Sequence, residues 1–126
     1  MANEIGSMLD QVGRILARDT AYPLDGTFLY VEAEWQMVGM SIFKDLGDRL
    51  LYRDPMNELG EALLELWGAA LPDKRCSTMQ YRIMGDKFDA SFTYDLLDPK
   101  VSAIDRREVI LRQLYGNKLV VYPPLK

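Results

Sequence analysis

The chain has 126 residues, of which 48% are hydrophobic and 27% are charged, a balance typical of one soluble globular domain. The 19 acidic and 15 basic residues give a net charge of −4, which argues mildly against a nucleic-acid-binding surface and is compatible with a basic protein partner. No apolar stretch approaches the ~20 residues of a membrane helix, and the absence of histidine removes Ser-His-Asp and Cys-His catalytic systems and His-ligated zinc sites.

The N-terminal residues show no basic region followed by an apolar run, so they do not resemble a signal peptide and we expect a cytoplasmic protein. Asn3 can cap a first helix, and apolar residues then recur at helical spacing from Ile5 to Leu16. From Thr27 apolar and polar residues alternate, as they do in a half-buried strand. In chain order we predict a helix over 5–16 and strands over 27–35, 38–42 and 49–53, with a tight reversal near Gln36.

The middle of the chain predicts a second helix and then a hairpin. Asp54 is followed by proline, which makes it a strong candidate for a helix cap, and the helix ends before Pro72. Two alternating segments, 77–84 and 87–94, flank a turn at Gly85. We therefore predict a β-hairpin with one apolar face.

The C-terminal part predicts a third helix and a short strand. Ser102 with Asp105 resembles a capping box, and the helix runs to about Tyr115 before a Gly-Asn stop. Residues 119–122 are apolar enough for a short edge strand.

The order α-β-β-(β)-α-β-β-α favours an α+β fold in which helices pack mainly on one face of an antiparallel sheet. We expect a single domain over residues 1–126, with the strand hydrophobics, including Phe88 and Phe92, facing the helices. The residues expected on the other, polar face are Glu32, Glu34, Gln80, Arg82, Lys87, Asp89, Ser91 and Thr93.

Few residues offer catalytic or metal-binding chemistry, because the chain has neither a glycine-rich phosphate loop nor metal-ligand spacing. Glu32 and Glu34 are a minor candidate for a glycosidase pair, but the solvated face of a strand is favoured. Cys76 beside Arg75 is a minor candidate for a reactive thiolate, but a loop thiol is favoured because no histidine can relay a proton. A cation site is a minor alternative to ordinary turn capping for Asp86, Asp89, Asp95 and Asp98. We therefore predict no enzymatic activity, no metal and no cofactor.

Residues 86–116 read DKFDASFTYDLLDPKVSAIDRREVILRQLYG and contain a series of motifs. A Lys-Phe turn leads into an alternating strand that ends in Tyr94 and Asp95, an Arg-Arg-containing helix follows, and the segment closes on Tyr115 and Gly116. This segment resembles the closing part of the YezG-like immunity proteins, and the first helix and FLYVEAEW strand are similar to that family's start. The order of elements fits over about residues 3–116, while the tail after Gly116 has no counterpart.

The resemblance implies a cytoplasmic antidote that neutralises a cognate secreted or contact-dependent antibacterial toxin, often a nuclease, by blocking its active or substrate-binding site. An acidic surface would suit a basic nuclease domain as the partner. The predicted partner-binding residues are Glu32, Glu34, Asp89, Tyr94, Asp95 and Asp98. We expect no direct binding to nucleic acid or membrane, and whether the chain forms a homodimer stays open. A type III secretion chaperone that holds an effector is the alternative function.

Overall fold

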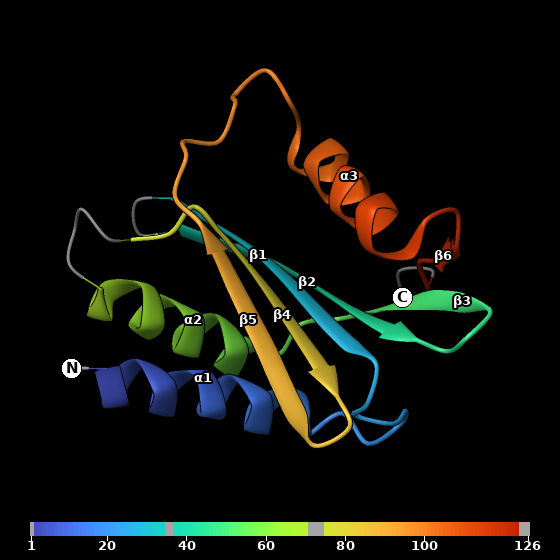
Figure 1. Ribbon diagram of the computed structural model, residues 1–126, viewed down its shortest axis with the longest axis horizontal. Coiled ribbons are helices and arrows are strands. Elements are labelled where there is room, and N and C mark those ends of the chain that lie inside the picture. The colour runs from blue at the N-terminus through green and yellow to red at the C-terminus, as the bar shows by residue number, and fades with distance from the viewer. Residues whose placement is uncertain (1, 35–36, 71–74, 124–126) are drawn as a thin grey trace.

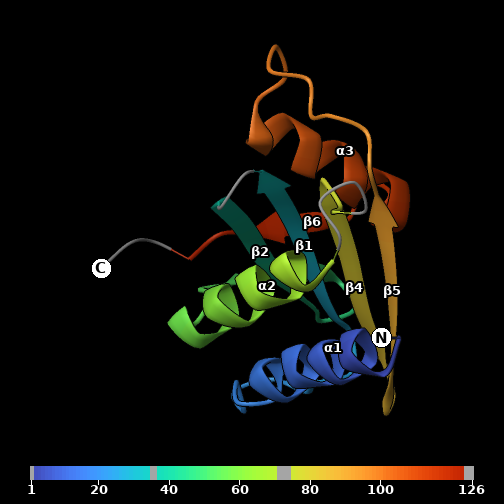
Figure 2. The same ribbon diagram turned by 90° about the vertical axis from the view of Figure 1, so that its left-hand side faces the viewer.

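The computed structural model describes residues 2–34, 37–70 and 75–123. Within them, three helices and six strands form an α+β fold, as predicted, and the strands lie in the order β5-β4-β1-β2-β3-β6. Helices α1 and α2 cover one face of the sheet and α3 lies on the other (Figures 1 and 2). The elements are α1 (Ala2–Leu16), β1 (Thr27–Glu34), β2 (Met37–Asp45), β3 (Arg49–Arg53), α2 (Asn57–Ala69), β4 (Thr78–Met84), β5 (Lys87–Thr93), α3 (Ala103–Tyr115) and β6 (Leu119–Val121).

The predicted order of elements is confirmed, and the C-terminal segment adds the strand β6, which pairs in parallel with β3. The other strand pairs are antiparallel. Two predicted helix starts are wrong, because α1 already begins at Ala2, ahead of Asn3, and α2 begins at Asn57 with Met56 rather than Asp54 at the cap position. The predicted reversal at Gln36 and the stop at Pro72 lie outside the described residues. No helix in the described ranges is long and apolar enough to cross a membrane.

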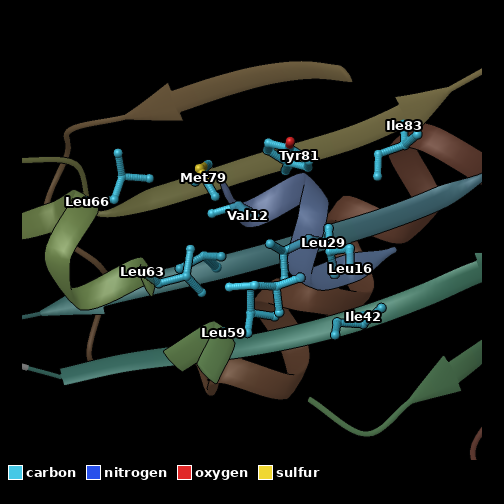
Figure 3. Close-up of a cluster of buried hydrophobic side chains, with 12 residues drawn as sticks. Val12, Leu16, Leu29, Ile42, Leu59, Leu63, Leu66, Met79, Tyr81 and Ile83 are labelled. Carbon is cyan, nitrogen blue, oxygen red and sulfur yellow. The ribbon is translucent and has the colours of Figure 1, made fainter. Parts of the chain in front are cut away.

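The larger core lies between the sheet and the helices α1 and α2 (Figure 3). Leu29 of β1, Ile42 of β2 and Tyr81 of β4 are buried here, and α2 contributes Leu59 and Leu63. The hydroxyl of Tyr81 donates a hydrogen bond of 2.8 Å to the carbonyl oxygen of Leu9, so the ring is held against α1. Burial of this phenol raises the pKa of Tyr81 to about 12.

Tyr81 also explains a glycine in the middle of α1. A Cβ atom at Gly13 would lie 2.7 Å from the Tyr81 hydroxyl oxygen, which is closer than any ordinary contact. Gly13 therefore lets α1 approach β4 closely, at the usual cost of a glycine within a helix.

A second, smaller core lies on the opposite face, under α3. Phe28 and Tyr30 of β1 and Phe43 of β2 are buried there against Leu111 of α3. The expectation that this face is simply solvated is therefore wrong for β1 and β2. Because Phe28, Leu29, Tyr30 and Val31 follow one another along β1, their side chains point to both faces, and both faces are covered by helices.

The β4–β5 hairpin has the predicted register, with Gly85 in its turn at a φ of 63°, a conformation that favours glycine. Phe88 stacks on Tyr81 with ring centroids 4.8 Å apart, and Phe92 packs against the larger core. Both rings keep part of their surface open to solvent, and Phe88 is 37% exposed. The hairpin therefore faces the helices as predicted, but β5 is covered less completely than β4.

A buried lysine lies on the α1 and α2 side of β2. Lys44 is 1% exposed, and its Nζ atom donates hydrogen bonds to Thr27 Oγ1 (2.7 Å) and the carbonyl oxygen of Pro23 (3.2 Å). The nearby carboxylate of Asp19 is held by a bidentate pair with Arg53, at 2.6 and 3.0 Å. Burial therefore dominates and lowers the pKa of Lys44 below its usual 10.5.

Replacing Phe92 with alanine should lower the free energy of unfolding by about 1–3 kcal/mol, less than the ~3–5 kcal/mol of a fully buried phenylalanine. Urea unfolding measures this change. Tyr94→Ala is the control, because that ring is 60% exposed and its loss should cost less than about 0.5 kcal/mol. Equal effects of the two changes would contradict the packing of Phe92 described here.

Replacing Lys44 with methionine should change how stability depends on pH. Because the folded-state pKa of Lys44 lies below 10.5, the unfolded chain binds more protons in the window between these two values. The free energy of unfolding contributed by Lys44 therefore rises with pH across that window, and Lys44→Met should remove this rise. Urea unfolding of both proteins between about pH 7 and 10 measures it. Parallel stability curves would show that Lys44 is not desolvated.

Candidate partner-binding surface

The connection between β5 and α3 is the most exposed acidic segment of the candidate site. We call residues 94–102 the acidic loop. It rises from the end of β5 and projects beyond the sheet before it enters α3 (Figures 1 and 2). Leu96 is 97% exposed and Tyr94 is 60% exposed, and the neighbouring Asp95 and Asp98 are exposed as well. The loop thus presents two large, exposed side chains, those of Tyr94 and Leu96, beside exposed carboxylates.

An arginine of α3 holds this loop in place. The Nη1 atom of Arg106 donates to the carbonyl oxygens of Asp98 (2.9 Å) and Val101 (2.5 Å). Its Nε and Nη2 atoms form a bidentate pair with Glu32 of β1, at 2.6 and 3.0 Å. Arg106 therefore joins the end of the acidic loop to the centre of the sheet, and we call this arrangement the Arg106 clamp.

The electrostatics of the Arg106 clamp favour the charged form of the arginine. Its hydrogen bonds to Glu32, with the nearby charge of Glu34, raise the pKa of Arg106 above its usual value. Tyr30 donates a hydrogen bond of 2.8 Å to Glu32, and burial and this bond raise the pKa of the Tyr30 phenol. Both carboxylate oxygens of Glu32 are thus occupied by groups of the same chain.

The predicted partner-binding residues consequently fall into four places. Tyr94, Asp95 and Asp98 share the acidic loop, as their sequence positions require. Glu34 is exposed at the end of β1, close enough to Arg106 for its charge to act on that residue. Two further carboxylates are set apart: Glu32 is 13% exposed and belongs to the clamp, and Asp89 lies on β5 opposite Arg82.

Sequence reasoning did not identify the Arg106 clamp, because the two partners are separated by 74 residues. It also missed the neighbouring Arg107, whose guanidinium lies 5.2 Å from the ring centre of Tyr122, 5.8 Å from Phe43 and 5.9 Å from Tyr52. The Arg107 Nη1 atom donates to Ser41 Oγ at 3.1 Å. The Arg-Arg pair in the third helix was the visible signal, but only the register of β1 and β2 reveals which groups it meets.

Cys76 lies in an apolar pocket of about 220 Å³ rather than in a polar cleft. Trp67, Phe92 and Tyr94 also line it, and Trp67 Nε1 donates to the carbonyl oxygen of Cys76 at 2.9 Å. Burial raises the pKa of the Cys76 thiol, which disfavours the reactive thiolate. Within the described ranges, no group of three or more acidic, cysteine or histidine residues is arranged to hold a metal ion.

The minor glycosidase candidates Glu32 and Glu34 differ in their surroundings, since Glu34 is exposed and Glu32 is engaged within the chain. The Glu32 carboxylate already accepts hydrogen bonds from Arg106 and Tyr30 of the same chain. The site therefore presents exposed carboxylates and apolar side chains on a loop whose end is held by Arg106.

Comparison with protein-family models finds no match for this chain, and no curated protein is significantly similar to it in sequence.

Proposed function

We propose that this protein is a cytoplasmic immunity protein that binds and neutralises a cognate antibacterial toxin. The toxin that suits it best has a basic surface, as a nuclease does. The observation that carries the proposal is the acidic loop, which presents Tyr94 and Leu96 among carboxylates while Arg106 fixes its end. The sequence resemblance to the YezG-like immunity proteins supports the same function.

The chemistry of the acidic loop suits such a partner. A nuclease must bind phosphates, so its substrate-binding surface carries lysine and arginine. The carboxylates of Asp95 and Asp98 can steer association with those cations, and Leu96 can bury its whole side chain in the same contact. Covering the basic surface would deny the nucleic acid its binding site without any chemistry by the immunity protein.

The Arg106 clamp supports this proposal energetically. A flexible loop loses conformational freedom on binding, at a cost of about 0.5–1.5 kcal/mol for each ordered side chain. The bonds from Arg106 to the carbonyl oxygens of Asp98 and Val101 order part of the loop in the free protein. We therefore assign Glu32 and Arg106 to positioning the loop, and Asp95, Leu96 and Asp98 to contact.

The proposed function requires no catalysis by this chain. Histidine is absent from the sequence, and the pKa of the single thiol, that of Cys76, is raised by burial. Neutralisation by binding requires neither a nucleophile nor a cofactor, and depends instead on fast association and slow dissociation.

Reversing one loop charge should weaken toxin binding. The partner for this test is a basic toxin domain selected from the genes that neighbour this one. With it, we expect Asp95→Lys to slow association about tenfold and to reduce its dependence on salt. Leu96→Ala should instead speed dissociation, because an apolar anchor is lost. Binding kinetics at two salt concentrations, with toxicity rescue in cells, measure both effects.

Glu65→Lys is the matched control, since Glu65 is an exposed acid on α2, on the other side of the sheet. Wild-type kinetics for both loop variants would place the toxin contact elsewhere. If the chain binds no neighbouring toxin but does bind an unfolded secreted effector, the type III secretion chaperone is the better function.

Replacing Arg106 with lysine should loosen the acidic loop while keeping the charge. Lysine cannot bond two carboxylate oxygens and two carbonyl oxygens at once, so we expect stability to fall by about 1–2 kcal/mol. The amide of Val101, which donates to the Asp98 carbonyl at 3.1 Å, should exchange its hydrogen faster. Arg112→Lys on the exposed side of α3 is the control. Unchanged exchange at Val101 in Arg106→Lys would show that the clamp does not order the loop.

A further inference from the structure

The strand β5 forms one edge of the sheet. Its seven residues, Lys87–Thr93, pair with β4 on one side, and no other described element pairs with its outer side (Figure 1). The opposite edge is β6, which has three residues. A seven-residue open edge is long enough to accept another strand, and natural proteins usually cover or interrupt such an edge.

The register of the hairpin fixes which backbone groups of β5 are free. The two-residue turn at Gly85 and Asp86 places Met84 opposite Lys87, and these two residues form the first hydrogen-bonded pair of the hairpin. Along β5, every second residue from Lys87 then directs its N–H and C=O groups toward β4, and the residues between direct theirs away from it. The outward residues are Phe88, Ala90 and Phe92. The carbonyl oxygen of Thr93 accepts from the Ser77 amide at 2.7 Å and so points toward β4, as this alternation requires.

The side chains of these three residues give the edge an apolar flank. Phe88, Ala90 and Phe92 point to the face covered by α1 and α2, where they are only partly buried, and Phe88 remains 37% exposed. The outer face of the same strand is polar, with Lys87, Asp89, Ser91 and Thr93. An added strand would therefore cover apolar surface as well as satisfy backbone groups.

We propose that β5 pairs in antiparallel orientation with β5 of a second copy of this chain, about a two-fold axis at Ala90. This register uses the three outward residues of each copy and places Phe88 beside Phe92 of the other copy. It sets Asp89 opposite serine and Lys87 opposite threonine, so no like charges meet. A register centred on Asp89 would set two carboxylates directly opposite each other, and of the three outward residues it would pair only Phe88 and Ala90.

Disulfide trapping tests this register without any toxin. In a Cys76→Ser background, Ala90→Cys places two cysteines directly opposite each other, with Cα atoms about 5.5 Å apart, within disulfide range. Lys87→Cys is the control, because two-fold symmetry separates its two copies by about 20 Å. We expect a cross-linked dimer for Ala90→Cys under mild oxidation and little for Lys87→Cys.

Solution mass gives a second, independent measurement. We expect wild-type protein at about 100 µM to have twice the 14.4 kDa mass of one chain by light scattering. Ala90→Pro removes an outward N–H that β4 does not use, so the variant should have the mass of a single chain. A wild-type monomer at this concentration would overturn the proposal, as would cross-linking of Lys87→Cys equal to that of Ala90→Cys. If Ala90→Pro fails to fold, the wild-type mass and the cysteine variants still decide the question.

Discussion

Strand β1 carries apolar side chains on both of its faces, and the rest of the structure follows from covering them. Leu29 and Val31 are buried under α1 and α2, while Phe28 and Tyr30 are buried under α3. A sheet with two apolar faces needs two layers of helices. The chain therefore has to carry α3 from the end of β5, at one edge of the sheet, to the far side of β1.

The acidic loop is the connection that makes this crossing. A loop that spans a sheet edge has few neighbours, so its side chains stay exposed and polar contacts have to hold its backbone. Arg106 provides those contacts from within α3, and Glu32 provides the counter-charge from β1. The carboxylate of Glu32 therefore helps to position the loop, whereas the carboxylates of Asp95 and Asp98 on the loop itself remain exposed.

The sequence predicted much of the fold because local signals agree with the tertiary contacts. Alternation along residues 27–34 and 87–93 indicated strands, and Ser102 was correctly placed at the helix cap, where it accepts from the Asp105 amide at 3.1 Å. Asp54 carried an equally good capping signal, yet the cap position of α2 is Met56 and the helix starts at Asn57. The side taken by α3 was not predicted, although Phe28 and Tyr30 stood at the polar-face positions of β1.

The candidate site was predictable only where exposure follows from position in a turn. Asp95 and Asp98 lie after a strand and before a helix, and they are exposed as expected. Glu32 has the same chemistry and the same strand pattern as Glu34, but a partner 74 residues away determines its role. No pattern in one sequence distinguishes two acids whose difference is a long-range contact. The YezG-like resemblance therefore stays a prediction about function.

Helix α3 is attached to the sheet by a small apolar core with polar contacts around it. Leu111 is its fully buried residue within the described range, and Arg106, Arg107 and the Lys118–Asp45 pair at 2.9 Å supply polar anchors around it. The core between the sheet and α1 and α2 does not depend on those anchors. We therefore expect the segment from α3 to β6 to open before the larger core does, so its amides should be protected from hydrogen exchange by a smaller free energy than those of β1 and β4.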